Sequence, residues 1–155
     1  MHESFMEKAV ALAAQYSAKG DNGPFGAIVV CQDKIVGEGW NRVVETHDPT
    51  AHAEIIAIRE ACSHLGRHDL SDCVMYSSCE PCPMCLAAIY WAHIPTYYYA
   101  CTREDARKAG FDDEFIYREL AQKPEARRVK GIPLPSSDAL NVFHQWSNNP
   151  ARIRY

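Results

Sequence analysis

The chain has 155 residues, 47% of them apolar and 23% charged, the length and balance of one ordinary globular domain. Its net charge is −4 and its basic residues are scattered, which argues against a broad nucleic-acid-binding face. No segment approaches the roughly eighteen apolar residues of a transmembrane helix, and the N-terminus lacks the basic region of a signal peptide. We therefore expect a single cytoplasmic domain, residues 1–155, that does not bind membranes.

The first half of the chain predicts a helix, a β-hairpin and a second helix. Apolar side chains follow a helical period over residues 5–18. The stretch AIVVCQDKIVGEGW, which begins at Ala27, is typical of two strands with a bend at residues 32–34. A second helix is expected over residues 51–64, with Gly66 as its stop signal.

The second half continues the alternation of strands and helices. Residues 73–78 suit a strand, and Pro81 marks the start of a helix that extends to about His93, because proline fits the first helical position. The later elements are a buried-type strand at 96–101, a helix at 102–110, an irregular proline-rich connection at 124–135 and a helix at 138–148. This order predicts an α/β domain with a central sheet and helices on both faces.

The cysteines do not form the pattern of a disulfide framework, because there are seven of them. Four lie in apolar runs and are read as small core residues: Cys31, Cys62, Cys73 and Cys101. The other three, Cys79, Cys82 and Cys85, lie in the short stretch SSCEPCPMC. Clustered cysteines in a cytosolic chain more often bind metal or carry out redox chemistry.

Two short motifs together predict a catalytic zinc site. Cys82 and Cys85 are three residues apart near a helix start, so both sulfurs can reach one ion. His52 supplies a third ligand, and mixed sulfur and imidazole ligands favour Zn²⁺. Three protein ligands leave a position for water, and Glu54 lies beside it as a proton carrier. The H-x-E and P-C-x-x-C pair is a known signature of zinc nucleobase deaminases.

Three other readings of these motifs compete with the catalytic one. A C-x-x-C pair alone is compatible with thioredoxin-like redox chemistry, and the triple spacing with an iron–sulfur cluster, although position 89 is Ile where that pattern needs cysteine. A third reading is a zinc-stabilised binding module without activity. Glu54 argues against it, because structural zinc sites close all four positions and need no base. Cys79 lies before the predicted helix and is read as a strand-end core residue.

Along nearly its whole length the sequence resembles the cytidine deaminase-like superfamily and, more narrowly, its small bacterial guanine deaminases. The motifs that carry the resemblance are NGPFGA (22–27), DPTAHAE (48–54), SCEPCPMC (78–85), AIYWA (88–92), AGFDD with FIY (109–117) and the terminal Tyr155. The resemblance implies a three-layer α/β/α fold around a five-stranded mixed sheet. It also implies a homodimer in which the segment of about 124–155 is exchanged between subunits, with the proline-rich connection as a hinge.

The resemblance further implies hydrolysis of guanine to xanthine and ammonia, with one Zn²⁺ per subunit. Water activated at the zinc attacks C2, Glu54 moves its proton to a ring nitrogen, and Asp113 serves as a second proton donor, for the leaving amine. Base-binding contacts are expected from Phe25, Asn41, the backbone N–H of Ala53, Trp91 and a pocket-closing Tyr155. Guanosine, an aminotriazine and tRNA adenosine are the alternative substrates.

Overall fold

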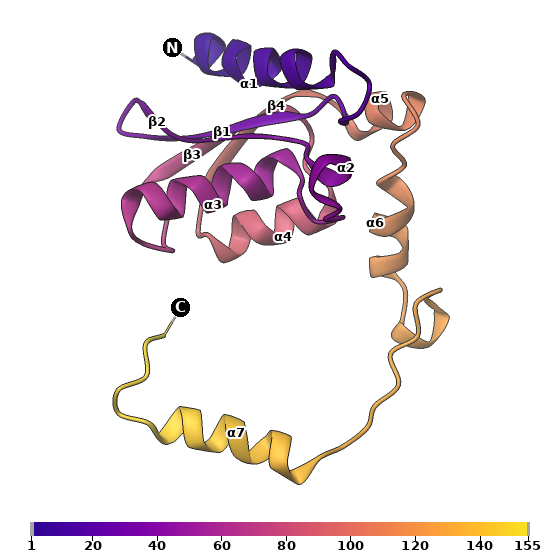
Figure 1. Cartoon of the computed structure of the whole chain (residues 1–155). Coiled ribbons are helices and arrows are strands. Elements are labelled where there is room, and N and C mark those ends of the chain that lie inside the picture. Colours follow the sequence, from indigo (N-terminus) through magenta and orange to yellow (C-terminus); the bar gives the residue numbers. More distant parts are fainter. Residues whose placement is uncertain (1, 155) are drawn as a thin grey trace. The chain divides into compact units, whose positions relative to one another are not determined.

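The computed structural model describes residues 2–154 (Figure 1). Its elements are α1 (His2–Ser17), β1 (Gly26–Cys31), β2 (Lys34–Trp40), α2 (Val43–Thr46), α3 (Ala53–Leu65), β3 (Cys73–Cys79), α4 (Pro83–Trp91), β4 (Thr96–Cys101), α5 (Arg103–Lys108), α6 (Glu114–Ala121), a 3₁₀ turn (Pro124–Ala126) and α7 (Ser137–Asn148). The chain divides into two compact units, Met1–Tyr117 and Arg118–Tyr155, and each is described by itself.

The first unit contains a mixed sheet of four strands in the order β2-β1-β3-β4. β1 pairs antiparallel with both β2 and β3, and β4 joins β3 in parallel. The predicted five-stranded sheet is therefore wrong for residues 2–154, although the mixed α/β character is confirmed. After β4 the chain continues into helices, and the later stretch at 124–135 contains three prolines, which cannot donate to a strand ladder.

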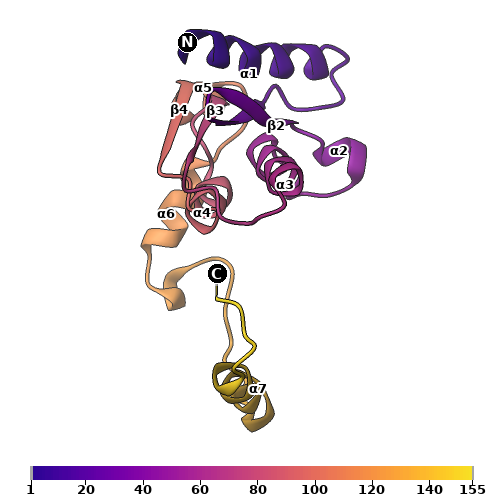
Figure 2. The ribbon, with the colours of Figure 1, turned by 90° about the vertical axis from the view of Figure 1, so that its left-hand side faces the viewer.

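Helices cover the two faces of this sheet and enclose two cores (Figure 2). On one face α1 packs over Ile28, Val30 and Tyr76. On the other face α3 and α4 pack over a larger apolar cluster that includes Ala27 and Val29. Successive residues of β1 thus enter opposite cores, as the two-residue period of a strand requires, and all six of its residues are buried.

Most of the predicted elements are present, with shifted limits. The hairpin turns at Gln32 and Asp33, both in the left-handed conformation, and α3 ends at Gly66 with a φ of 65°. α4 begins at Pro83 rather than Pro81, because Pro83 takes the first helical position and Cys82 becomes the N-cap. The strand predicted as buried, β4, is largely exposed within this unit.

Two helices lie where no helix was predicted. α2 has only four residues, too few to produce a recognisable period. α6 spans eight residues directly after the Asp112-Asp113 pair. No helix among residues 2–154 is long and apolar enough to cross a bilayer.

Gly39 of β2 allows β2 and α3 to lie in close contact, and this contact positions the start of α3. A Cβ built on Gly39 would lie 2.0 Å from the carbonyl oxygen of Ala53 and 2.7 Å from the nitrogen of Ala57. Since both atoms belong to the α3 backbone, the helix would have to move away from the sheet. Gly39 therefore fixes the distance at which the first turn of α3, with His52 and Glu54, stands over the sheet.

We expect Gly39→Ala to lower the free energy of unfolding by about 1–3 kcal/mol, the usual cost of overpacking a core. Denaturant titration measures the loss. Gly131→Ala is the matched control, because nothing lies within 4 Å of its added Cβ and its φ is not positive. Equal stability of Gly39→Ala and the wild type would contradict the proposed role of this contact.

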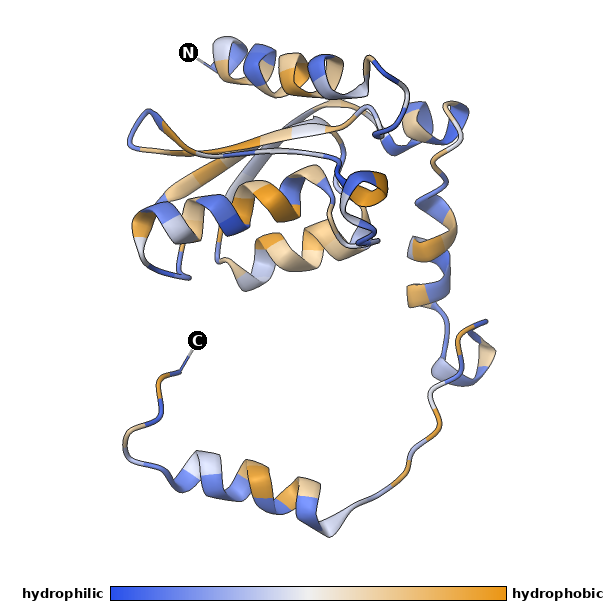
Figure 3. Cartoon of the chain, in the orientation of Figure 1, coloured by the Kyte–Doolittle hydropathy of each residue, from blue (hydrophilic) through white to orange (hydrophobic). Residues whose placement is uncertain are grey.

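The second unit exposes several large apolar side chains. α7 is amphipathic, with apolar and polar sides visible in Figure 3. Its large apolar side chains are exposed: Phe143 is 72% accessible and Leu140 is 56% accessible. No residue of α7 is buried. Single exposed apolar residues are common, but a run of them on one helix marks a surface that something else covers.

Candidate active site

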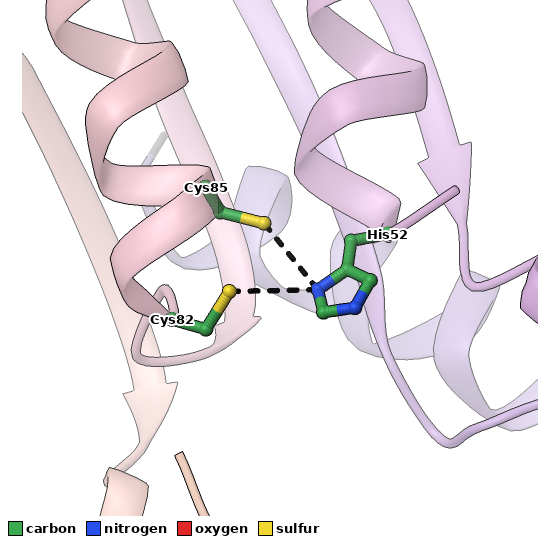
Figure 4. A group of neighbouring side chains, drawn as sticks. All are labelled: His52, Cys82 and Cys85. Carbon is green, nitrogen blue, oxygen red and sulfur yellow. Dashed lines mark hydrogen bonds between the residues drawn. The ribbon is translucent and has the colours of Figure 1, made fainter. Parts of the chain in front are cut away.

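Two helix starts bring the predicted zinc ligands together (Figure 4). His52 is the N-cap of α3, Cys82 is the N-cap of α4, and Cys85 lies in the first turn of α4. The Nδ1 atom of His52 lies 3.6 Å from Cys82 Sγ and 3.5 Å from Cys85 Sγ. Both cysteines are buried, and the three residues form a group able to hold a metal ion.

The spacing of these donor atoms fits tetrahedral zinc. Bonds of about 2.3 Å to sulfur and about 2.0 Å to nitrogen at a tetrahedral angle place the two donors about 3.5 Å apart. The observed separations of 3.6 and 3.5 Å have this value. Two sulfurs and one imidazole are also the donor types that select Zn²⁺ over Mg²⁺ or Ca²⁺. The residues present therefore fit a zinc ion with one position left for water.

The electrostatics of the site favour a thiolate at Cys82. A hydrogen bond from the Cys85 thiol is the largest cause, with a further one from His52, and the pKa of Cys82 falls to about 4. As the donor of that bond and a buried group, Cys85 has a raised pKa. The start of α4 adds the positive end of a helix dipole, which also favours negative sulfur.

Glu54 lies one residue beyond the start of α3 and is buried, with 6% of its surface accessible. Burial raises the pKa of its carboxyl group. Ser77, on β3, donates a hydrogen bond to Glu54 Oε1 at 3.5 Å. A buried carboxyl with a raised pKa accepts and returns a proton near neutral pH more readily than an exposed one.

The loop before Cys82 is tied to the segment that follows β4. Glu80 accepts hydrogen bonds from the backbone N–H of Arg103 at 3.0 Å and from its guanidinium at 3.2 Å. The hydroxyl of Tyr117 donates to the carbonyl oxygen of Pro81 at 2.9 Å. These contacts hold the backbone on the N-terminal side of the metal ligand Cys82.

Cys79 is not among the three metal-binding candidates of this site. Its Sγ donates to the carbonyl oxygen of Thr102 at 3.5 Å, and burial raises its pKa to about 11. Unlike Cys82, it therefore stays protonated at neutral pH. The structure separates the three evenly spaced cysteines into two ligands and one core thiol.

A cavity of about 430 Å³ opens beside the metal-binding group. This volume lies within the range of small-molecule sites. Of the residues predicted to act on the substrate, Phe25, Asn41, Glu54 and Asp113 line the cavity together with the ligands His52 and Cys82.

Two aromatic rings and a buried amide are among the side chains that line the cavity. The ring of Phe25 meets that of Phe111 edge to face, with centroids 4.8 Å apart. Asn41 is 8% accessible, and its Oδ1 accepts a hydrogen bond from the backbone N–H of Val43 at 3.3 Å. This contact orients the Asn41 amide. Phe111 was not singled out from the sequence, because its place depends on the path of the chain after α5.

Asp113 faces the same cavity from the loop before α6. Burial, followed by the negative charge of Cys82, raises the pKa of its carboxyl group. Two carboxyl groups with raised pKa values, Glu54 and Asp113, therefore line one cavity next to the metal-binding group. This arrangement can move two protons in one reaction.

Two predicted contact residues, Ala53 and Trp91, are not among the described residues that line the cavity. Ala53 is fully buried at the first position of α3. Trp91, at the end of α4, is 70% accessible. Trp91 follows Cys85 by six residues. At about 100° per residue, its side chain therefore leaves the axis of α4 about 120° away from that of the metal ligand Cys85. Tyr155 lies outside the described residues, and the roles of all three stay predictions.

The comparisons with known proteins agree with this geometry. Residues 1–101 match the cytidine and deoxycytidylate deaminase zinc-binding region, and the chain belongs to this family of zinc-binding deaminases. It is 48% identical to the guanine deaminase of Bacillus subtilis (strain 168) over 99% of each chain. A crystal structure of guanine deaminase from B. subtilis superposes with a TM-score of 0.95 at 46% identity, covering 100% of this chain and 99% of that one. A tRNA-specific adenosine deaminase from Aquifex aeolicus is 41% identical over 93% of this chain and 92% of its own length.

Proposed function

We propose that this protein is a zinc-dependent guanine deaminase, which hydrolyses guanine to xanthine and ammonia. The observation that carries the chemistry is the group of His52, Cys82 and Cys85 beside the buried Glu54 at one cavity. The choice of guanine rests on the likeness to the B. subtilis enzyme, which extends over the C-terminal segment as well as the zinc motifs.

His52, Cys82 and Cys85 would hold the zinc, which lowers the pKa of water and supplies a nucleophile at neutral pH. Glu54 takes the proton of the attacking water and passes it to a ring nitrogen of the base, which makes C2 more electrophilic. The purine ring lies against Phe25, and Asn41 reads its polar edge. By closing the pocket, Tyr155 would exclude bulk water, while Ala53 N–H and Trp91 would add contacts to the base.

We further propose Asp113 as the group that donates a proton to the leaving amine. Its place on the cavity wall and its raised pKa support this role. We expect Asp113→Asn to lower kcat for guanine about 100-fold, the lower end of the effect of a general acid. Asp112→Asn is the matched control, since Asp112 is adjacent but is not part of the cavity wall. Equal kcat values for the two variants would argue against the assignment.

The test of the proposed function is ammonia release by zinc-loaded protein. Guanine, guanosine, an aminotriazine, adenine, cytosine and a tRNA anticodon hairpin are compared at equal concentration. We expect guanine to give the highest kcat/KM. Faster release from the tRNA hairpin, with guanine inert, would instead assign the protein to the tRNA adenosine deaminases.

We also propose a homodimer in which residues of about 124–155 are exchanged between subunits, so that residues 1–155 form one functional domain. The exposed apolar side chains of α7 support this proposal, as does the exposed β4 of the first unit. Three prolines at 124–135 suit a stiff connection between the exchanged parts.

We also propose a cytoplasmic location, because thiolate ligands such as Cys82 and Cys85 persist in a reducing compartment.

Light scattering after size-exclusion chromatography tests the assembly. We expect a dimer for the wild type and a monomer for Phe143→Glu, because a charge on the apolar side of α7 would have to be buried without a partner. Gln145→Glu changes a polar residue of the same helix and should remain dimeric. A wild-type monomer would refute the proposed exchange.

A further inference from the structure

A second group of potential metal ligands lies apart from the proposed active site. Cys31, the last residue of β1, is paired with Cys73, the first residue of β3, in the antiparallel register. The active site lies at the opposite ends of these two strands, where Gly26 donates its N–H to Ser78 Oγ. Five residues of strand, about 17 Å at 3.3 Å each, separate the two ends of β1.

Asp72 completes this second group. Its Oδ2 lies 3.5 Å from Cys31 Sγ, and its Oδ1 lies 3.5 Å from Cys73 Sγ. One donor atom from each of the three residues lies within 4.8 Å of the others. Each of these two distances, one for each carboxylate oxygen, equals the separation expected for a sulfur and an oxygen on one tetrahedral zinc, at about 2.3 and 2.0 Å from the metal. Binding through a single oxygen of Asp72 would require the three side chains to draw closer together than 4.8 Å.

The charges around the group suit a bound dication. Two thiolates and one carboxylate around a divalent ion leave a net charge of −1, and the guanidinium of Arg67 neutralises it. Arg67 Nη2 donates to Asp72 Oδ1 at 2.6 Å and lies 3.9 Å from Cys31 Sγ. A charged partner that holds a ligating carboxylate in place is a common feature of metal sites.

We propose that Cys31, Asp72 and Cys73 form a second metal site, which takes a thiophilic divalent cation such as Zn²⁺. The site has an outer side, because Asp72 is exposed, while both cysteines are buried. Burial raises the pKa of Cys73 to about 12, so the ion has to displace a proton. Ions that bind thiolate strongly can do this, whereas Mg²⁺ and Ca²⁺, which prefer oxygen, cannot.

Metal counting in buffered Zn²⁺ tests the proposal, with the full chain and elemental mass spectrometry. We expect two zinc ions per wild-type chain, one in Cys31→Ser and one in His52→Ala. Cys62→Ser is the control, since Cys62 is a free cysteine of α3 outside the group, and it should keep two. The zinc count requires no assay of activity, so its outcome is independent of the proposed function. Guanine turnover by Cys31→Ser should equal that of the wild type.

Two results would overturn the second site. One is a single zinc per wild-type chain, unchanged in Cys31→Ser. The other is a metal-free wild type in which mass spectrometry finds Cys31 and Cys73 joined as a disulfide. A Zn²⁺-dependent rise in melting temperature for His52→Ala, absent when Cys31→Ser is added, would support the site even if the single variants fold less well.

Discussion

Replacing Glu54 by glutamine should lower kcat for guanine by about 10²–10⁴-fold while the protein keeps its catalytic zinc. Glutamine has the size of glutamate and can accept the Ser77 hydrogen bond, but it cannot take up and return a proton. The loss therefore corresponds to the usual contribution of a general acid–base group. Zinc stays because His52, Cys82 and Cys85 form the metal-binding group without Glu54. Ammonia release and zinc content are measured on the same sample.

Glu60→Gln is the matched control for this change. Glu60 lies on the same helix, α3, is exposed, and accepts the Glu38 N–H through an oxygen that glutamine retains. We expect wild-type kcat and zinc content. If Glu54→Gln were fully active, the protein would not use Glu54 as its proton carrier. If it lost zinc along with activity, Glu54 would support the metal site rather than the chemistry.

The metal centre could be predicted from the sequence because its parts are local. His52 and Glu54 are two residues apart, and Cys82 and Cys85 are three apart, so each pair has nearly fixed geometry once a helix begins there. The prolines at 81 and 83 and the turn residues at 48–50 indicate where these helices begin. The two helix starts meet at one point because of the order of the strands in the sheet. This strand order cannot be predicted from the two motifs alone.

The cavity wall was less predictable, because it depends on contacts between distant segments. Phe111 reaches Phe25 only because the chain turns back after α5, and no spacing in the sequence reports that turn. Trp91 is predicted to contact the base from its place on α4; it is 70% accessible and does not line the cavity, and its role stays a prediction. Periodicity identifies the apolar side of a helix, but not which neighbour that side meets.

The sheet shows a related limit. The aromatic run Tyr97–Tyr99 predicted a buried strand, because aromatic residues are enriched in strands and a continuous apolar run is typical of a strand buried on both faces. β4 is a strand, but Tyr98 and Tyr99 are 41% and 44% accessible. A sequence does not distinguish apolar surface that its own fold buries from surface that a second subunit buries. The same ambiguity applies to α7, which has the pattern of a core helix without buried residues.

Cys82→Ala should lower the affinity of the catalytic site for zinc by more than about 100-fold. Loss of a residue that only supports a ligand costs roughly 10–100-fold, and Cys82 is itself a ligand, with a pKa of about 4 that keeps it a thiolate at neutral pH. Guanine turnover should fall in parallel, because without the ion no water is activated. Zinc affinity is measured by competition with a chelator in a Cys31→Ser background, so that only the catalytic site is counted.

Cys79→Ala is the control for this change, because Cys79 lies three residues earlier, is equally buried and donates to a backbone carbonyl rather than facing His52. It should keep zinc and activity, with at most a modest loss of stability. If Cys79→Ala lost zinc and Cys82→Ala retained it, Cys79 rather than Cys82 would be the metal ligand. The paired experiment therefore tests the central structural claim about SSCEPCPMC, that the start of α4 at Pro83 selects Cys82 and Cys85 as ligands and leaves Cys79 in the core.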